Sequence, residues 1–427
     1  MTLTASGASR DAATAPNPSF DLGPAHALSC RECGHTVPLA AEFACVQCFG
    51  PLEVAYEFGD VTRERIEAGP RSIWRYADLL PVPTDVASHP NTDPGLTRLI
   101  KADRLAAELG VRELWIKDDT GNPTHSFKDR VVAVALAAAR ELGFRVLACP
   151  STGNLANAVA AAAARAGWDS VVLIPSSLEQ AKVLTTAVYG GTLIAVDGTY
   201  DDVNRLATEL ASEREDWAFV NVNVRPYYAE GSKTLGYEVA EQLGWRLPEQ
   251  VVVPVASGSQ LTKVDKGFTE FGKLGLVEPT PYKVFGAQAT GCSPVAAAFE
   301  AGVDVVRPVR PDTIARSLAI GNPADGPYVL DTVRRTGGAV THVSDAEVVE
   351  GIGLLARTEG VFAETAGGVT VACARKLIES GQLDPDAETV LLITGDGLKT
   401  LDAVADVLAP TATVAASTAA VRDALGG

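Results

Sequence analysis

The sequence is short of several features, and each shortage narrows the class of protein that it can encode. Only seven cysteines occur in 427 residues, which is too few for a scaffold held together by disulfides. No apolar run reaches the roughly 20 residues that a membrane-spanning helix needs. Residues 1–20, MTLTASGASRDAATAPNPSF, lack the apolar segment of a secretory signal. We therefore expect a soluble protein of the reducing cytoplasm, with a disordered tail over residues 1–24.

Positive charge is also scarce. Lys and Arg together number 36 against 53 Asp and Glu, which gives a formal net charge of -17. Such a chain repels a nucleic-acid backbone or an anionic lipid surface unless a local basic patch overcomes the overall field. The composition therefore predicts no nucleic acid and no membrane as partners. With 47% hydrophobic residues, the chain can bury a large core and is long enough for more than one domain.

Four of the cysteines form two CxxC pairs within SCRECGHTVPLAAEFACVQCFG. Each pair can place two thiolates on one tight turn, and two such turns complete a closed tetrahedral zinc site. Gly34 and Gly50 lie just beyond the pairs, where the chain has to turn. We therefore expect a zinc-ribbon-like module over residues 25–58, with zinc serving folding and not catalysis. Four free thiols, or a nucleic-acid-binding ribbon, are the alternatives. The proposed ligands are Cys30, Cys33, Cys45 and Cys48.

Most of the remaining chain alternates between apolar strand-like runs and alanine-rich helical runs. LWIKDD, RVLACP, SVVLIP, QVVVPVAS, KVFGAQA and TVLLITGDG are the strand-like runs, and VVAVALAAARELG and NLANAVAAAAARAG are helical. Such alternation is typical of parallel sheets covered by helices on both faces. We expect an α/β fold of two lobes over residues 59–408, each with a mostly parallel sheet flanked by helices and with a cleft between the lobes. Residues 409–427 are predicted to form a peripheral helix or tail.

The segment DDTGNPTHSFKDR, residues 118–130, places a lysine at the start of a helix. Residues 121–123, Gly-Asn-Pro, break the chain after a strand, and we expect Ser126 to cap the helix that follows. Lys128 then lies near the positive end of the helix, which favours the neutral amine that can attack an aldehyde. The spacing by itself favours an ordinary surface lysine in the first turn of a helix.

Two further loops follow strands and can bind anions. Residues 151–154, Ser-Thr-Gly-Asn, lead into a long helix and offer backbone N–H groups and hydroxyls. Residues 257–259, Ser-Gly-Ser, follow another apolar strand and can form a nest of N–H groups for a phosphate. Thr262 is a further candidate donor. Each loop taken alone is also compatible with an ordinary turn.

In this order along an α/β chain, the motifs resemble those of threonine synthases, which are fold-type-II pyridoxal-phosphate enzymes of the tryptophan synthase β-like fold. The resemblance rests on NPTHSFKDR and on LLITGDGLKT, residues 391–400, with support from RPYYAEGSKTLGYE, SLAIGNPADGP and FAETAGGVTVA. It covers roughly residues 25–402.

The resemblance implies roles for individual residues. Lys128 would carry the cofactor covalently, Asn154 would bind the ring hydroxyl, and Thr394 would meet the pyridine nitrogen. Ser151, Thr152 and Asn154 would hold the substrate carboxylate, although Leu155 stands where relatives often have a hydroxyl. The cofactor phosphate would be bound by Ala256, Ser257, Gly258, Ser259 and Gln260, where relatives usually have a loop of the GNxGN kind.

The implied reaction converts O-phosphohomoserine and water into threonine and phosphate. Its dianionic phosphate needs local cations or neutral donors in an acidic protein, and the candidates are Lys182, Asn223, Arg225 and Lys233. A β-replacement enzyme acting on O-phosphoserine, of the cysteate synthase kind, is the alternative, together with a serine or threonine dehydratase. An interaction protein with an inactive enzyme fold is the non-enzymatic alternative. A homodimer is the expected assembly.

Overall fold

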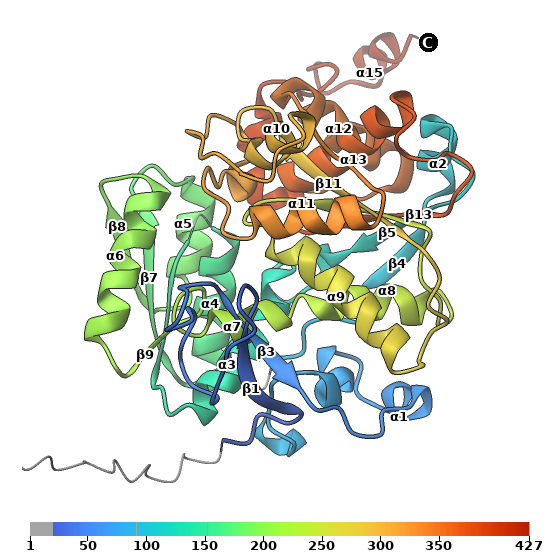
Figure 1. Ribbon diagram of the computed structural model, residues 1–427. Coiled ribbons are helices and arrows are strands. Elements are labelled where there is room, and N and C mark those ends of the chain that lie inside the picture. Colours follow the sequence, from blue (N-terminus) through green and yellow to red (C-terminus); the bar gives the residue numbers. More distant parts are fainter. Residues whose placement is uncertain (1–19, 91, 152, 427) are drawn as a thin grey trace, which may run out of the picture.

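Three β-sheets organise the chain in the computed structural model, which describes residues 20–90, 92–151 and 153–426. Figure 1 shows a lobe built on a four-stranded sheet, a larger lobe built on a six-stranded sheet, and a small N-terminal sheet lying against both. The expectation of an α/β fold with two helix-flanked sheets is therefore confirmed. The expected tail over residues 1–24 lies largely outside the described residues.

The four-stranded sheet is entirely parallel, with the order β8-β7-β6-β9. Alternate residues of its strands face opposite layers of helices, as the period of two requires. Leu147 and Val172 pack with α3 and α4, whereas Ala148 and Val171 pack with α6. The elements are β6 (Val146–Pro150), β7 (Asp169–Pro175), β8 (Thr192–Val196), β9 (Trp217–Phe219), α3 (Lys128–Glu141), α4 (Asn154–Ala166), α5 (Gln180–Ala187) and α6 (Tyr200–Glu213).

The six-stranded sheet has the order β12-β11-β10-β13-β5-β4, and only the edge strand β4 is antiparallel to its neighbour. Val251 and Val253 face a core with α8 and α9, and Val252 faces the opposite core with α12 and α13. The strands are β4 (Arg98–Lys101), β5 (Leu114–Asp118), β10 (Gln250–Pro254), β11 (Lys283–Ala289), β12 (Val340–Val343) and β13 (Thr389–Ile393). The helices are α2 (Asp103–Leu109), α8 (Lys233–Gln242), α9 (Ser259–Lys273), α10 (Pro294–Glu300), α11 (Gly326–Arg335), α12 (Asp345–Glu359) and α13 (Thr365–Glu379).

The N-terminal sheet is antiparallel, with the order β2-β1-β3, and we call residues 25–58 the N-terminal module. Tyr56 donates to Glu230 of α7 at 2.8 Å, and Lys263 of α9 donates to Glu53 at 2.6 Å, so the module is bonded to two helices. The elements are β1 (Ala25–Cys30), β2 (Thr36–Val37), β3 (Leu52–Tyr56), α1 (Arg63–Glu67) and α7 (Arg225–Glu230).

Short helices complete the chain. They are η1 (Ile73–Leu79), η2 (Val86–Ser88), η3 (Asp119–Gly121), η4 (Arg316–Leu318), η5 (Gly397–Thr400), α14 (Asp402–Ala405) and α15 (Thr418–Ala424). None of the seven residues of α15 is buried, and the helix lies at the edge of the larger lobe in Figure 1. Among the described residues, no helix has the length and apolar character needed to cross a membrane.

Candidate active site

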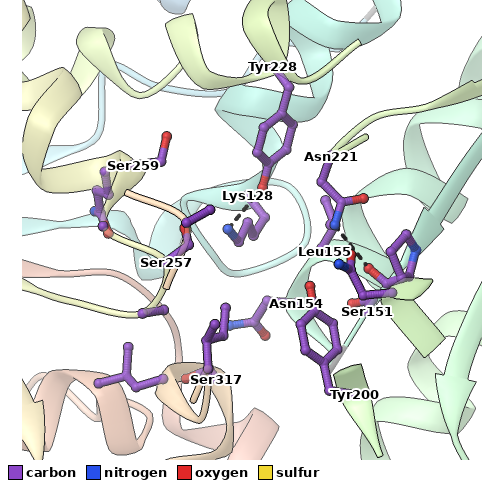
Figure 2. Close-up of a pocket in the computed structure, with 18 of the residues that line it drawn as sticks. Lys128, Ser151, Asn154, Leu155, Tyr200, Asn221, Tyr228, Ser257, Ser259 and Ser317 are labelled. Carbon is purple, nitrogen blue, oxygen red and sulfur yellow. Dashed lines mark hydrogen bonds between the residues drawn. The ribbon is translucent and has the colours of Figure 1, made fainter. Parts of the chain in front are cut away.

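A cavity of about 330 Å³ opens where the carboxyl ends of strands from both large sheets meet. Thr394 follows β13, Ser151 follows β6, and Ser257 lies in the loop after β10. Figure 2 shows Lys128 near the centre, with Ser257 and Ser259 on one side and Ser151 and Asn154 on the other. Loops at this edge of an α/β sheet are the usual place for a ligand. The topology thus brings together segments that lie far apart in the sequence.

Lys128 is the first residue of α3, and its side chain lines the cavity while remaining partly buried. Its Nζ atom lies 3.0 Å from the hydroxyl oxygen of Tyr228. Desolvation by the surrounding protein lowers the pKa of the ammonium to about 8, against an opposing influence of the Glu364 carboxylate. A minor fraction of the amine is therefore neutral near physiological pH, whereas an ordinary lysine is almost fully protonated there.

The start of α3 differs in one respect from the sequence-based expectation. The helix is capped by Phe127, without a side-chain cap hydrogen bond, and the buried hydroxyl of Ser126 has no partner among the described residues. The prediction that Ser126 caps the helix is wrong. The chain is held instead by the Phe127 N–H, which donates to the carbonyl oxygen of Thr394 at 2.9 Å. This bond fixes Lys128 and Thr394 on the same cavity wall.

Asn154 lies at the start of α4 and forms the opposite wall. Its side-chain nitrogen donates to both carboxylate oxygens of Glu364, at 2.9 and 3.0 Å, while its Oδ1 atom is buried without a partner among the described residues. Glu364 lies just before α13 and is 1% exposed. The FAETAGG segment did not by itself point to Glu364, because nothing in the local pattern indicates that the segment returns to α4.

Ser151 organises the loop before α4. Its Oγ atom accepts hydrogen bonds from the N–H groups of Gly153 at 3.0 Å and Ala156 at 2.9 Å. Two of the N–H groups expected to bind an anion are thus already bonded to this hydroxyl, whose own proton remains available to a ligand. Leu155 also lines the cavity. Thr152, the other predicted carboxylate contact, lies outside the described residues.

The loop from Ala256 to Gln260 lines the cavity throughout, as its assignment to a phosphate requires. Gly258 has φ +99°, and a Cβ atom there would lie 2.7 Å from Val329 and 3.0 Å from Asp325. Only glycine fits this turn without strain. The following helix α9 directs its unpaired N–H groups toward the loop, where an anion would be stabilised. Thr262 instead donates to the Ser259 carbonyl at 3.0 Å and does not line the cavity.

Of the four residues predicted to bind the substrate phosphate, only Arg225 lines the cavity. Its Nη2 atom donates to Asp325 at 2.7 Å. Lys182 is buried behind Gly153, and its ammonium is 3.5 Å from Glu179. Asn223 donates to the Trp217 carbonyl at 3.0 Å. The structure therefore does not bring Lys182 and Asn223 to the cavity.

The structure also corrects the prediction that Lys233 binds the substrate phosphate. Its ammonium is fully buried, 2.8 Å from Glu230 and 3.0 Å from Glu270, and it faces the ring of Tyr56 at 4.1 Å. A buried lysine needs such partners to remain charged. It therefore joins α7, α8 and α9 to the N-terminal module and does not contact the cavity.

Three further cavity residues were not anticipated. Tyr200, Asn221 and Tyr228 line the same space, and Figure 2 shows them around Lys128 and Asn154. Tyr228 is the one that the sequence could have indicated, because it lies three residues after Arg225 and therefore on the same helical face.

The lining fits pyridoxal phosphate, the cofactor that the resemblance implies. Buried polar atoms without partners among the described residues belong to side chains that line the cavity, and a polar ligand could satisfy them. They are Asn154 Oδ1, Asn221 Oδ1, Gln260 Nε2 and Ser317 Oγ. The amine of Lys128, the glycine turn at Gly258 and the hydroxyl of Thr394 supply groups for an aldehyde, a phosphate and a ring nitrogen.

A separate cluster of donors lies in the N-terminal module. The Sγ atoms of Cys30, Cys33, Cys45 and Cys48 all lie within 4.8 Å of one another, and we call these residues the four-cysteine cluster. Zn–S bonds of about 2.3 Å place tetrahedral sulfurs about 3.8 Å apart. The Cys33–Cys45 pair is 3.8 Å apart, and the Cys30–Cys48 pair is 3.4 Å apart. The arrangement is compatible with a four-thiolate metal site.

Comparisons with known proteins identify the family to which this chain belongs. Residues 91–395 match the family model described as pyridoxal-phosphate dependent enzyme. A threonine synthase from Methanocaldococcus jannaschii is 37% identical over 88% of this chain and 93% of its own length. One from Methanosarcina acetivorans is 36% identical over 94% of this chain and 98% of its own length.

Solved structures agree at the level of the fold. A fungal L-serine ammonia-lyase from Rhizomucor miehei, 22% identical, aligns with a TM-score of 0.62 over 73% of this chain and 97% of its own. Maize serine racemase, 22% identical, aligns with a TM-score of 0.59 over 70% of this chain and 88% of its own. The family model and the extended sequence matches together show that the chain belongs to the threonine synthase family of pyridoxal-phosphate dependent enzymes.

Proposed function

We propose that this protein converts O-phospho-L-homoserine and water into L-threonine and phosphate. The observation that supports this most directly is the partly buried amine of Lys128, with its pKa of about 8, on the same cavity wall as Thr394 and facing the Ser257–Gln260 loop. Threonine synthase relatives matching over most of the chain select this reaction among those that the fold supports.

Pyridoxal phosphate, when bound, supplies the electron sink that makes the protons on the substrate's Cα and Cβ acidic. Lys128 would provide the amine that holds the cofactor, and the Ala256–Gln260 loop would bind its phosphate. Asn154 and Thr394 would bind the ring, and Ser151 would bind the substrate carboxylate. All of these residues line the same cavity.

Lys128 Nζ would then move the protons of the reaction. A pKa close to the working pH lets one amine accept and return protons. It would remove a proton from Cα, give that proton up, and then remove a proton from Cβ, after which phosphate leaves from Cγ. Water would add its oxygen to Cβ, and protons would return to Cγ and Cα. The Tyr228 hydroxyl, 3.0 Å from Nζ, would orient the amine throughout.

Arg225 would bind the phosphate of the substrate. Its guanidinium lines the cavity, and one nitrogen is bonded to Asp325, so that the remaining donors can face an anion. A dianionic leaving group in an acidic protein needs such a fixed cation, because the net charge of -17 would otherwise oppose its binding.

The four-cysteine cluster would hold one structural zinc ion. Four thiolates close a tetrahedral site and leave no position for a substrate, so the metal would stabilise the N-terminal module and take no part in the chemistry. A homodimer and a cytoplasmic location complete the proposal. The location is supported by the seven cysteines, all of which are unpaired.

A product assay would test the function. Purified protein loaded with pyridoxal phosphate is given O-phosphohomoserine or O-phosphoserine, and phosphate, threonine, pyruvate and 2-oxobutyrate are measured. Phosphate and threonine should form in equal amounts from O-phosphohomoserine. Lys128→Ala should lower this turnover by several orders of magnitude, because it removes both the attachment point and the base.

The same assay discriminates the alternatives. Preferential turnover of O-phosphoserine would indicate a β-replacement enzyme, and a 2-oxo acid as the main product would indicate a dehydratase. Threonine formation by Lys128→Ala near the parent rate, or borohydride trapping of the cofactor on another lysine, would refute the assignment of Lys128.

A further inference from the structure

Asp325 lies between two arginines that come from different parts of the fold. Its Oδ2 atom accepts a hydrogen bond from Arg225 at 2.7 Å, and its Oδ1 atom is 3.7 Å from Arg31. Its side chain is 7% exposed, and although the residue precedes α11 it makes no capping bond to that helix. Its backbone N–H donates to the Ser257 carbonyl at 2.9 Å. Asp325 thus contacts the cavity arginine and the phosphate-binding loop at once.

Arg31 belongs to the N-terminal module and directly follows the first cysteine of the four-cysteine cluster. Its guanidinium stacks on the ring of Tyr328 at 3.6 Å and is 3.3 Å from Glu53. Its backbone N–H donates to the Pro51 carbonyl at 3.0 Å, which ties it to the start of β3. The guanidinium is therefore held in place by both the module and α11.

The module also reaches the cavity directly. Phe43, two residues before Cys45, is among the residues that line it. The Phe43 carbonyl accepts the Leu52 N–H at 3.0 Å, so the position of this side chain depends on the pairing of the module's own backbone. Two independent contacts thus connect the N-terminal module to the candidate active site.

We propose that Arg31 and Asp325 are positioning residues that orient Arg225 toward the substrate phosphate, so that the N-terminal module is part of the substrate site. This rests on the proposed function. Arg31 attracts one oxygen of Asp325 and offsets part of its charge. Without Arg31, the carboxylate acts on Arg225 alone and withdraws it from the cavity, which weakens phosphate binding.

Arg31→Ala tests the proposal in the holoenzyme. We expect KM for O-phosphohomoserine to rise about three- to fivefold, in the range of a partly exposed ion pair, with kcat within about twofold of the parent. Inhibition by inorganic phosphate should weaken by the same factor, and the cofactor absorbance should be unchanged. Arg31→Lys keeps the positive charge but replaces the planar guanidinium by an ammonium, and it should recover part of the lost affinity.

The matched control is Arg334→Ala. Arg334 lies in the same helix α11 and pairs with Asp304, whose side chain is 92% exposed, away from the cavity lining. This variant should keep the parent KM and phosphate inhibition. Zinc content is measured for each variant. If Arg31→Ala loses zinc, Tyr328→Leu replaces no residue of the module and removes the ring beneath the guanidinium, together with the bond from the Tyr328 hydroxyl to Glu32. The same rise in KM is required of this variant when it keeps its zinc.

A double variant decides whether Arg31 acts through Arg225. In the Arg225→Ala background, Arg31→Ala should change neither KM nor phosphate inhibition further, because the residue that it positions is absent. An equal fold-change in both backgrounds, or a parent-like KM in Arg31→Ala, would overturn the proposal. If the parent enzyme forms no threonine from O-phosphohomoserine, the proposed function fails instead, while inorganic phosphate binding still reports on Arg31.

Discussion

The Nζ atom of Lys128 lies 3.0 Å from the hydroxyl of Tyr228, and the two residues come from α3 and α7. They are 100 residues apart in the chain, yet α3 and α7 pack directly against each other. Tyr228 is buried, and burial raises the pKa of its phenol, so it stays protonated at working pH. The amine therefore has a neutral partner that fixes its direction without adding charge.

Tyr228→Phe should lower kcat about ten- to a hundredfold with KM for O-phosphohomoserine within about twofold, because one hydrogen bond to a charged group contributes roughly 1.5–3 kcal/mol. Steady-state kinetics of the holoenzyme measure this. Tyr227→Phe is the control, since its hydroxyl donates to the Ala40 carbonyl at 2.9 Å and does not line the cavity. Equal kinetics for the two variants would show that the Tyr228 hydroxyl has no catalytic part.

The lowered pKa of Lys128 predicts a pH-dependent stability of the cofactor-free protein. The pKa falls from an ordinary 10.5 to about 8 on folding, so between these values the unfolded chain binds more protons than the folded one. The free-energy cost of keeping this lysine protonated in the folded protein is present in full below pH 8. It disappears as the pH rises to 10.5.

Lys128→Met should therefore stabilise the cofactor-free protein at pH 7 by roughly 1–3 kcal/mol, and the gain should shrink above pH 8. Urea unfolding at about pH 7 and about pH 9.5, on either side of the folded-state pKa, checks this. Lys273→Met, at an exposed position, controls for the added methionine. A gain that is the same at both pH values would contradict the assigned pKa.

Gly258→Ala should weaken cofactor binding. Its φ of +99° and the approach of Val329 within 2.7 Å of a new Cβ atom impose strain of roughly 1–3 kcal/mol, or about five- to 150-fold in affinity. Titration of the cofactor-free protein with pyridoxal phosphate measures this. Gly275→Ala has φ +69° and no atom within 4 Å of the new Cβ, so it tests backbone conformation alone. A parent-like dissociation constant for Gly258→Ala would show that this loop does not bind the cofactor phosphate.

Zinc analysis of protein purified without added metal should give close to one equivalent per chain. Cys45→Ser should lose the ion and lower Tm, since a closed thiolate site contributes folding free energy. Threonine formation should persist with a raised KM for O-phosphohomoserine, because no cysteine of the cluster lines the cavity but the module holds Arg31 and Phe43. Cys292→Ser, at a buried cysteine outside the cluster, should keep its zinc. Well-folded, active parent enzyme without metal would rule out the site.

Local signals in the sequence predicted much of this architecture. The apolar runs around Leu114–Asp118 and Val146–Pro150 became parallel strands, and the alanine-rich runs became α3 and α4. Lys128 was expected at a helix start and is the first residue of α3. Such predictions succeed because side-chain periodicity and turn residues act over a few neighbouring positions. The prediction that Ser126 caps α3 failed because a backbone hydrogen bond from the Phe127 N–H to the Thr394 carbonyl determines that turn.

The sequence by itself determined the α/β class, the lysine at the helix start, the glycine turn at residue 258 and the spacing of the four cysteines. Only the tertiary structure decided which charged residues face the cavity. Arg225 and Lys233 are near neighbours in the chain, yet one lines the cavity and the other is buried between Glu230 and Glu270. Their environments depend on partners from α9 and on Asp325, because a charge is stabilised by whatever the fold places within a few ångströms of it. Sequence spacing does not contain that information.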